Sequence, residues 1–245
     1  MVKTDSLKEL KQELEELRNP EKARILQRFF KTGKGEYGEG DIFFGITTPQ
    51  SRGVAKKYTT LYFDELQELL NTNNHEYRFI ALLVLMQKYK LAKKAKNKEE
   101  QEKIFNFYLR NVRLGRINNW DLVDVTCRDI IGDFLIEQDK KILLNLAKSP
   151  KSNLWEKRIA IVSTWSFIRL GDFKTTIEIS EILLNDQHDL IHKAVGWMLR
   201  EVGKRDERVL LCFLNNHYKN MPRTMLRYSI EKLSKQKKEF YMKRE

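Results

Sequence analysis

The feature that most constrains this chain is a helical spacing of apolar residues that continues along nearly its whole length. Leu and Ile recur among Glu and Lys at three- and four-residue intervals, and only four prolines and 11 glycines interrupt the 245 residues. The first of these stripes consists of Leu7, Leu10, Leu14 and Leu17. Asn19 followed by Pro20 then predicts the cap and first turn of a second helix. We therefore expect an all-α fold.

An apolar-rich helix, a short break and a more polar helix recur along the chain. The apolar helices are expected to begin near residues 76, 118, 155 and 190, an interval of about 35 to 42 residues. This period suits stacked helix pairs of the HEAT or armadillo kind better than a closed bundle. Such stacks are curved, and one set of their helices lines a concave surface that can hold an extended partner such as a duplex.

No shift in composition marks a domain boundary, so we expect a single HEAT-like-repeat domain over residues 1–245. The sequence predicts N-terminal helices over 1–31, a glycine-rich loop over 32–47, stacked helix pairs over 48–233 and a frayed basic tail over 234–245. Nothing in the sequence points to oligomerisation, and we expect a monomer.

The charge balance favours a polyanionic partner. The chain has 46 Lys and Arg against 34 Asp and Glu, a formal net charge of +12 and a pI near 9.5. A positive field of this kind gathers polyanions, and nucleic acid is the leading candidate. The longest apolar run, Phe79 to Met86, is far too short to span a bilayer, and the N-terminus lacks the apolar stretch of a signal peptide. We therefore expect a cytoplasmic protein without membrane contacts.

No sequence motif predicts a cofactor or a metal. The loop Gly33 to Gly38 has the glycine spacing of dinucleotide-binding loops, but it follows a predicted helix instead of a strand. His188 and His192 lie one turn apart, but the expected Glu and a third ligand are absent. We interpret the glycines as freedom for a loop that can approach a phosphate, and the histidines as polar residues at a helix start. The two cysteines, Cys127 and Cys212, are interpreted as core thiols.

The helix around Trp197 has two different stripes. The apolar stripe consists of Ile191, Ala194, Val195, Met198 and Val202. Lys193, Trp197, Arg200 and Lys204 form the second at i, i+4, i+7 and i+11. A Trp flanked by three cations suits a nucleic-acid groove, where the cations pair with phosphates. The alternative is a Trp that is half-buried under long Lys and Arg stems.

Four aspartates lie in the segment from 117 to 134, INNWDLVDVTCRDIIGDF, and three of them have ordinary explanations. On a helical wheel the core stripe consists of Cys127, Ile130, Ile131 and Phe134, with Trp120 at its edge. Asp129 and Asp133 point away from that stripe, and Asp121 can serve a helix start that Asn118 caps. Asp124 lies just beyond Trp120. An i,i+4 pair with Arg128, worth about 0.3 to 0.5 kcal/mol, is one explanation for it, and position alone does not decide its role.

Arg158 also needs an explanation, because it shares a helix face with Trp155, Val162 and Trp165. A guanidinium on such a face requires an anionic partner. That partner is either a phosphate or an internal carboxylate.

These residues resemble the AlkD-like DNA alkylation repair family, bacterial DNA glycosylases built from HEAT-like repeats. The resemblance covers nearly the whole chain in order, and its W-D-x-V-D and G-W-x-L-R-E pieces are specific in combination. The matching segments are NPEKAR at 19–24, GEGDIFFGITTPQSR at 38–52, MQKYK at 86–90, NNWDLVD at 118–124, WEKRIAIV at 155–162 and KAVGWMLREVGK at 193–204.

The resemblance implies a curved, right-handed solenoid with a concave basic groove, and excision of cationic purines alkylated at N3 or N7 from duplex DNA, with no metal or organic cofactor. The residues that match the family's catalytic wall are Trp120, Asp124, Arg158 and Trp197. Thr48 and Arg52 are implied to hold the DNA backbone. The aromatic residue at the end of the second helix would be Phe29 or Phe30, where family members can carry Tyr.

The implied chemistry agrees with the charge pattern. A purine that is already cationic leaves readily, so the enzyme must stabilise the sugar cation that develops as the bond breaks. Asp124 can face that cation and orient the attacking water, while the π faces of Trp120 and Trp197 favour positive charge beside them. Two alternatives remain. A non-catalytic relative that binds damaged or bent DNA would not need Asp124, and a helical scaffold for a protein partner would bury the conspicuous residues.

Overall fold

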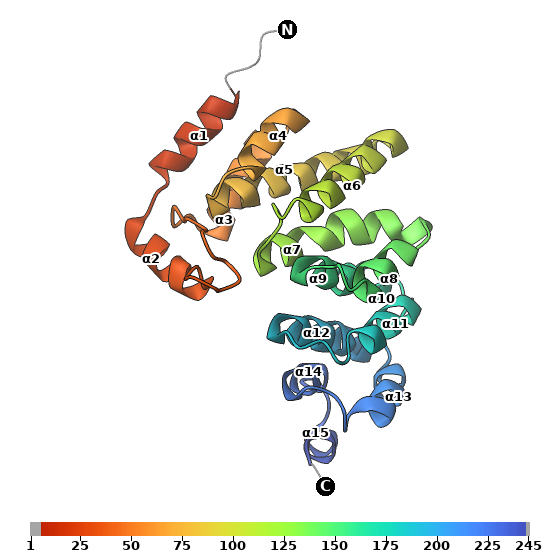
Figure 1. Ribbon diagram of the computed structural model, residues 1–245. Helices are drawn as coiled ribbons and strands as arrows, with labels where there is room; N and C mark the ends of the chain where they lie inside the picture. The colour runs from red at the N-terminus through yellow and green to blue at the C-terminus, as the bar shows by residue number, and fades with distance from the viewer. Residues whose placement is uncertain (1–5, 244–245) are drawn as a thin grey trace. The chain divides into compact units, whose positions relative to one another are not determined.

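The computed structural model describes residues 6–243, and this part of the chain is all-α (Figure 1). The predicted fold class is therefore confirmed for those residues. The only β-type pairing among the described residues is an isolated bridge between Ile42 and Asn74. Predictions for residues 1–5 and 244–245 lie outside the described range. The chain divides into two compact units, Met1–Leu122 (unit 1) and Val123–Glu245 (unit 2), with the boundary inside helix α7.

Unit 1 is organised around α5, which is apolar on nearly every side. Its helices are α1 (Ser6–Glu16), α2 (Pro20–Phe29), α3 (Thr48–Lys57), α4 (Phe63–Leu70), α5 (His75–Lys94), α6 (Lys98–Arg113) and the start of α7 (Trp120–Cys127). Helices α3, α4 and α6 each pack against α5, as Figure 1 shows. The run from Phe79 to Met86 is at most 4% exposed, because neighbours cover α5 all round. Asn74 caps α5 by accepting a hydrogen bond from the Tyr77 amide at 2.9 Å.

The predicted cap of the second helix is also confirmed. The side chain of Asn19 accepts a hydrogen bond from the Lys22 amide at 3.0 Å, and Pro20 is the first residue of α2. Pro20 is tolerated there because its missing N–H has no partner in the first turn.

The glycine-rich loop is held to the start of α5 by a buried carboxylate. Glu76 accepts hydrogen bonds from three backbone amides, those of Phe44 at 3.0 Å, Gly45 at 2.8 Å and Ile46 at 3.2 Å. Gly45 has a φ of +86°, and a β-carbon at this position would lie 2.2 Å from the carbonyl oxygen of Asn19. Only glycine satisfies both the backbone angle and this close approach.

Unit 2 consists largely of helices stacked in two rows. Its elements are the end of α7, the π-type turn η1 (Arg128–Gly132), the short 3-10 turn η2 (Leu135–Glu137), α8 (Lys141–Lys148), α9 (Leu154–Val162), α10 (Trp165–Ile168), α11 (Lys174–Ile182), α12 (Asp189–Arg205), α13 (Glu207–His217), α14 (Arg223–Ser229) and α15 (Lys235–Met242). In one row α12 packs between α9 and α14, and in the other α8 packs on α11 (Figure 1). This arrangement within unit 2 is compatible with helix-pair repeats. The curvature and concave groove expected for the whole chain remain predictions.

Small residues let the helices of unit 2 approach closely. A β-carbon at Gly196 would lie 2.5 Å from the carbonyl oxygen of Met225 and 2.6 Å from the Tyr228 side chain. The backbones of α12 and α14 therefore approach closely at the residue before Trp197. The apolar stripe of α12 is confirmed, since Ile191, Ala194, Val195, Met198 and Val202 are all 0% exposed.

Two local predictions differ from the structure. Most of the stretch predicted as a frayed basic tail forms helix α15, because Tyr241 is buried and its hydroxyl donates to Asn215 at 2.7 Å. Cys127 is a buried core thiol as predicted, but Cys212 is exposed. The reason is that α13 turns Leu210, Phe213 and Leu214 inward, and Cys212 falls on the opposite face.

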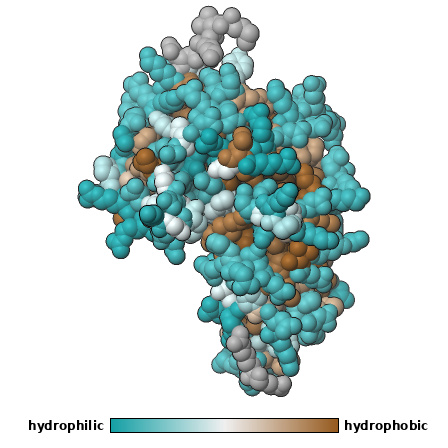
Figure 2. Space-filling model, in the orientation of Figure 1, coloured by the Kyte–Doolittle hydropathy of each residue, from teal (hydrophilic) through white to brown (hydrophobic). Residues whose placement is uncertain are grey.

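The surface agrees with the polar composition. Hydrophilic residues predominate on the face shown in Figure 2, with hydrophobic residues gathered over part of it. Among residues 6–243, no helix combines the length and the apolar character needed to cross a bilayer.

Gly45→Ala should destabilise the protein by more than about 2 kcal/mol, since it adds a steric overlap to an unfavourable backbone angle. Gly35→Ala is the matched control, because Gly35 has a φ of +79° and nothing within 4 Å of an added β-carbon. It should cost only about 1 kcal/mol. Urea unfolding of both variants measures the difference, and equal losses would contradict the close approach.

Candidate active site

The predicted site residues divide between the two units, and each group is described within its own unit. Trp120, Phe29, Phe30, Thr48 and Arg52 belong to unit 1. Asp124, Arg158, Trp197, Lys193, Arg200 and Lys204 belong to unit 2. Trp120 is the first residue of α7, and Asp124 follows it one turn later in the same helix.

Asp124 and Arg158 form a two-pronged ion pair in unit 2. Arg158 Nε donates to Asp124 Oδ1 at 2.8 Å, and Nη2 donates to Oδ2 at 2.7 Å. The third edge of the guanidinium donates through Nη1 to the Leu190 carbonyl at 2.5 Å. Arg158, for which the sequence allowed two kinds of partner, therefore has an internal carboxylate. Arg128, the alternative partner of Asp124, lies over the Trp165 ring instead, at 4.7 Å.

The burial of this pair is unequal. The Arg158 side chain is 6% exposed, whereas that of Asp124 is 15% exposed. A buried guanidinium that makes three hydrogen bonds has little freedom, and it fixes both carboxylate oxygens of Asp124. The partial exposure of the Asp124 side chain leaves it within reach of a water molecule or a ligand.

Trp197 is half-buried, and among the described residues its indole makes no recorded hydrogen bond, ion pair or ring contact. The three cations of its stripe all have acidic partners. Lys193 pairs with Asp189 at 2.7 Å, Lys204 pairs with Glu201 at 2.9 Å, and Arg200 pairs with Glu231 and Glu201. A surface pair such as Lys193–Asp189 contributes about 0 to 1 kcal/mol, so a phosphate can compete with it, whereas the Arg200 side chain is only 18% exposed.

In unit 1, Trp120 lies against the aromatic residues at the end of α2. Its ring stacks on Phe30, with centroids 5.1 Å apart and an interplanar angle of 11°, and it meets Phe29 edge-on at 5.8 Å. Phe30 is 6% exposed, whereas Phe29 is 61% exposed. Phe30 therefore supports the indole from inside the unit, and Phe29 presents its ring to solvent.

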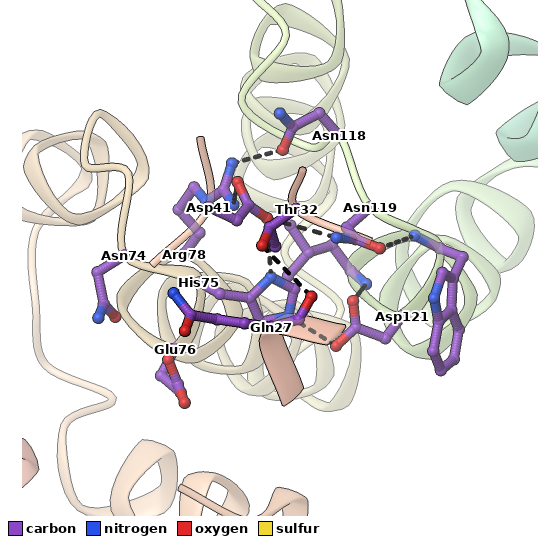
Figure 3. Close-up of polar contacts among 12 residues, drawn as sticks. Gln27, Thr32, Asp41, Asn74, His75, Glu76, Arg78, Asn118, Asn119 and Asp121 are labelled. Carbon is purple, nitrogen blue, oxygen red and sulfur yellow. Dashed lines mark hydrogen bonds and ion pairs between the residues drawn. The ribbon is translucent and has the colours of Figure 1, made fainter. Parts of the chain in front are cut away.

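A buried polar network lies beside this aromatic cluster (Figure 3). His75 Nδ1 lies 3.3 Å from Asp41 Oδ2, and its Nε2 lies 2.8 Å from Asp121 Oδ2. The Phe43 ring stacks on the imidazole with centroids 4.6 Å apart, and Phe30 lies 4.9 Å from it. The network therefore joins the glycine-rich loop, α5 and the start of α7.

Arg78 and two asparagines extend the network. Arg78 Nη2 lies 2.6 Å from Asp41 Oδ1, and Nη1 donates to the Asn118 side chain at 2.5 Å. Asn119 donates to Asp41 at 3.4 Å and accepts from the Trp120 amide at 2.8 Å. Asn118, predicted as the cap of this helix, therefore accepts from Arg78 instead. The network fixes the backbone from which the Trp120 side chain extends.

The charge of the network is set by its carboxylates. Burial by itself lowers the pKa of His75, but the negative charge and hydrogen bond of Asp121 and the hydrogen bond of Asp41 outweigh it and raise the pKa to about 9. Burial raises the pKa of Asp41, yet the hydrogen bond from His75 and the charges of His75 and Arg78 hold it below its ordinary value. At neutral pH an imidazolium therefore lies between two carboxylates.

The remaining predicted residues lie on the surface or at helix ends. Thr48 and Arg52 are exposed on α3. His188 accepts from the Leu190 amide at 3.1 Å as the cap of α12, and His192 contacts the Asp186 carbonyl, so both serve the helix start as expected. Among residues 6–243, no group of three or more His, Cys, Asp or Glu side chains is arranged to hold a metal ion.

Comparison with known proteins identifies the family. A sequence profile described as "DNA alkylation repair enzyme" matches residues 10–233. The chain belongs to this DNA alkylation repair family. A role in the repair of alkylated DNA follows from that membership.

A solved structure has the same fold as this family member. It is described as a predicted DNA alkylation repair enzyme from Enterococcus faecalis, and it superposes with a TM-score of 0.66 at 18% identity, covering 89% of this chain and 97% of that chain. At this identity the likeness shows the fold alone. No protein with a curated function matches the sequence significantly.

The polar network around His75 was not predicted from the sequence. Asp121 was assigned only to the helix start, and Asp41, His75 and Arg78 were not singled out. One signal was available, because His75, Glu76 and Arg78 begin a helix that is otherwise apolar on most sides. Charged residues in such a helix need internal partners, and the loop before it supplies Asp41.

The His75 network predicts a loss of stability in alkaline solution. Because the folded-state pKa of His75 is raised, its contribution is complete below the ordinary value of 6.5 and disappears as the pH rises through about 9. Between pH 7 and pH 10 we expect the free energy of unfolding of this repair-family protein to fall by roughly 1–3 kcal/mol more than that of His75→Gln. Urea titrations of both proteins at each pH measure this free energy of unfolding. Parallel pH curves for the two proteins would contradict a protonated His75.

Proposed function

We propose that this chain is a DNA glycosylase that hydrolyses the N-glycosidic bond of cationic N3- or N7-alkylated purines in duplex DNA. The observation that carries the proposal is the Asp124–Arg158 pair, in which a carboxylate that is 15% exposed has both oxygens fixed by a buried guanidinium. A fixed negative charge is what the reaction requires, because it stabilises a cation that exists only during bond cleavage. The family's role in alkylation repair supports the choice of substrate.

In the proposed reaction, the bond between the sugar C1′ and the purine nitrogen breaks and its electron pair leaves with the purine. The alkylated base is cationic beforehand, so it departs as a neutral molecule without needing a proton. A water molecule then attacks C1′ and gives up a proton, leaving an abasic sugar. Asp124 stabilises the positive sugar and orients that water, and the indoles of Trp120 and Trp197 are proposed to favour the cation beside them.

The contribution of Asp124 can be bounded. At 4 Å and an effective dielectric of 20, two unit charges interact by about 4 kcal/mol, or about 10³ in rate. Arg158 offsets part of this, because its own positive charge lies within 3 Å of both carboxylate oxygens. We therefore assign Asp124 a factor of roughly 10² to 10³.

The decisive assay is release of free base from a duplex containing 7-methylguanine. The wild-type protein should release the base and leave an abasic site, and Asp124→Asn should lower the rate by roughly 10² to 10³. Asp129→Asn is the matched control, because it removes the same charge from the adjoining turn η1 and should leave the rate unchanged. Equal rates for wild type and Asp124→Asn would reject the assignment.

Asp124→Asn also removes the partner of a buried guanidinium, which can cost about 3 to 5 kcal/mol. If that variant does not fold, the double variant Asp124→Asn/Arg158→Gln removes the unpaired cation as well. It should fold and remain inactive. A folded double variant that releases 7-methylguanine at the wild-type rate would also reject the assignment.

A second function is favoured by one observation. Because both oxygens of Asp124 are bound by Arg158, the pair can serve the structure alone, in a protein that binds DNA without cleaving it. That reading predicts no base release by the wild type from any alkylated duplex. It also predicts duplex-binding curves for wild type and Asp124→Asn that coincide.

A further inference from the structure

Two arginines of unit 2 make cation–π contacts with the same tryptophan ring. The guanidinium carbon of Arg128 lies 4.7 Å from the centre of the Trp165 ring, and that of Arg169 lies 5.0 Å from it. Arg128 begins the π-type turn η1, Trp165 begins α10, and Arg169 follows α10 directly. Arg169 is exposed, and the other two side chains are half-buried.

Within residues 6–243, neither guanidinium has an acidic partner. Among the described residues, no hydrogen bond or ion pair joins Arg128 or Arg169 to a carboxylate, and the buried Nε of Arg128 has no hydrogen-bond partner. In the same unit, Arg158, Lys193, Arg200 and Lys204 are all paired with acids. A phosphate that paired with these guanidiniums would supply the missing counter-charge.

The backbone that carries these side chains is firmly held. Ser166 Oγ donates a hydrogen bond to the Arg128 carbonyl at 2.8 Å, which ties η1 to α10. A β-carbon at Gly132 would lie 2.2 Å from the Ser163 carbonyl oxygen, so η1 packs directly on the chain before α10. π-type turns are often found at functional sites, where they change the direction of side chains.

We propose that Arg128, Trp165 and Arg169 form a binding subsite for a phosphate of the DNA backbone. The inference rests on the part of the proposed function that brings duplex DNA to unit 2, and it does not depend on base release. A guanidinium that lies on an indole face keeps its N–H edges free for paired hydrogen bonds to phosphate oxygens. The indole also orders both side chains in advance, which lowers the entropy lost on binding.

The subsite lies close in the sequence to the Asp124–Arg158 pair. Trp165 follows Arg158 by seven residues, across the break between the end of α9 at Val162 and the start of α10, and Arg169 follows by 11. Arg128 likewise follows Asp124 by four residues, in the same direction along the chain.

The test measures binding of the full chain to a fluorescein-labelled, undamaged 25-base-pair duplex by fluorescence anisotropy at several salt concentrations. Each phosphate contact contributes about −0.9 to the slope of log affinity against log salt. Arg128→Gln/Arg169→Gln should weaken binding about tenfold or more and make that slope about one unit shallower.

The control is Lys141→Gln/Lys174→Gln, which alters two cations that are 80% and 83% exposed in the same unit. Both double variants lower the formal net charge from +12 by the same two charges, so long-range attraction changes equally. The control slope should stay within half a unit of the wild-type slope. Equal slopes for the two double variants would overturn the subsite.

If circular dichroism shows that the arginine double variant is unfolded, the exposed Arg169 is tested alone. Arg169→Gln should then make the slope about one unit shallower, with Lys174→Gln as its control. Equal slopes for this pair would also overturn the proposal.

The binding measurement is separate from the glycosylase assay. A shallower slope together with no base release from 7-methylguanine keeps the subsite and rejects the enzyme. Base release with no difference between the arginine and lysine variants keeps the enzyme and rejects the subsite.

A neutral methylphosphonate moved one position at a time along the strand that carries a 7-methylguanine gives a further check. It should weaken wild-type binding at one of those positions and leave Arg128→Gln/Arg169→Gln unaffected. Equal losses in both proteins at every position would place the phosphate contact elsewhere.

Discussion

The structure of unit 1 depends on charges that are buried at the beginning of α5. His75, Glu76 and Arg78 are each at most 3% exposed, and each is neutralised or hydrogen-bonded by a segment that is distant in the sequence. Glu76 binds the loop amides at 44–46, Arg78 binds Asp41 and Asn118, and His75 binds Asp41 and Asp121. A buried charge without such partners would cost several kcal/mol, so these contacts specify one arrangement of the loop and the start of α7.

The Asp124–Arg158 pair of unit 2 also gives a buried charge a partner of opposite sign. In unit 1 the side chains of His75, Arg78 and Asp41 are almost fully enclosed, the Asp121 side chain is 16% exposed, and these charges fix the backbone. In unit 2 the cation is enclosed while the anion keeps an edge toward solvent. Enclosing the cation makes its position rigid, and leaving the anion accessible keeps its charge available to a third group. An accessible anion beside a rigid cation can take part in chemistry as well as stabilise the fold.

Much of the fold could be predicted from the sequence, because helix periodicity and caps are local properties. The apolar stripe of α12, the Asn19–Pro20 start of α2 and the buried Cys127 all follow from spacing within one element. What could not be predicted depends on which elements meet. The partner of Arg158 is 34 residues away, and the His75 network joins residues 41, 75 and 121. The face of α13 that turns inward was likewise decided by packing, and this left Cys212 in solvent.

Helix α2 has a property with consequences for the motion of the protein. None of its ten residues is buried, and Ile25 and Phe29 are more than half exposed. A helix of this length has little stability of its own in water, so α2 is held chiefly by its two ends, the Asn19 cap and the enclosed Phe30. Its amide protons should therefore exchange with solvent far sooner than those of α5. The outer aromatic neighbour of Trp120 is thus carried by a segment that opens and recloses while the indole's inner support stays in place.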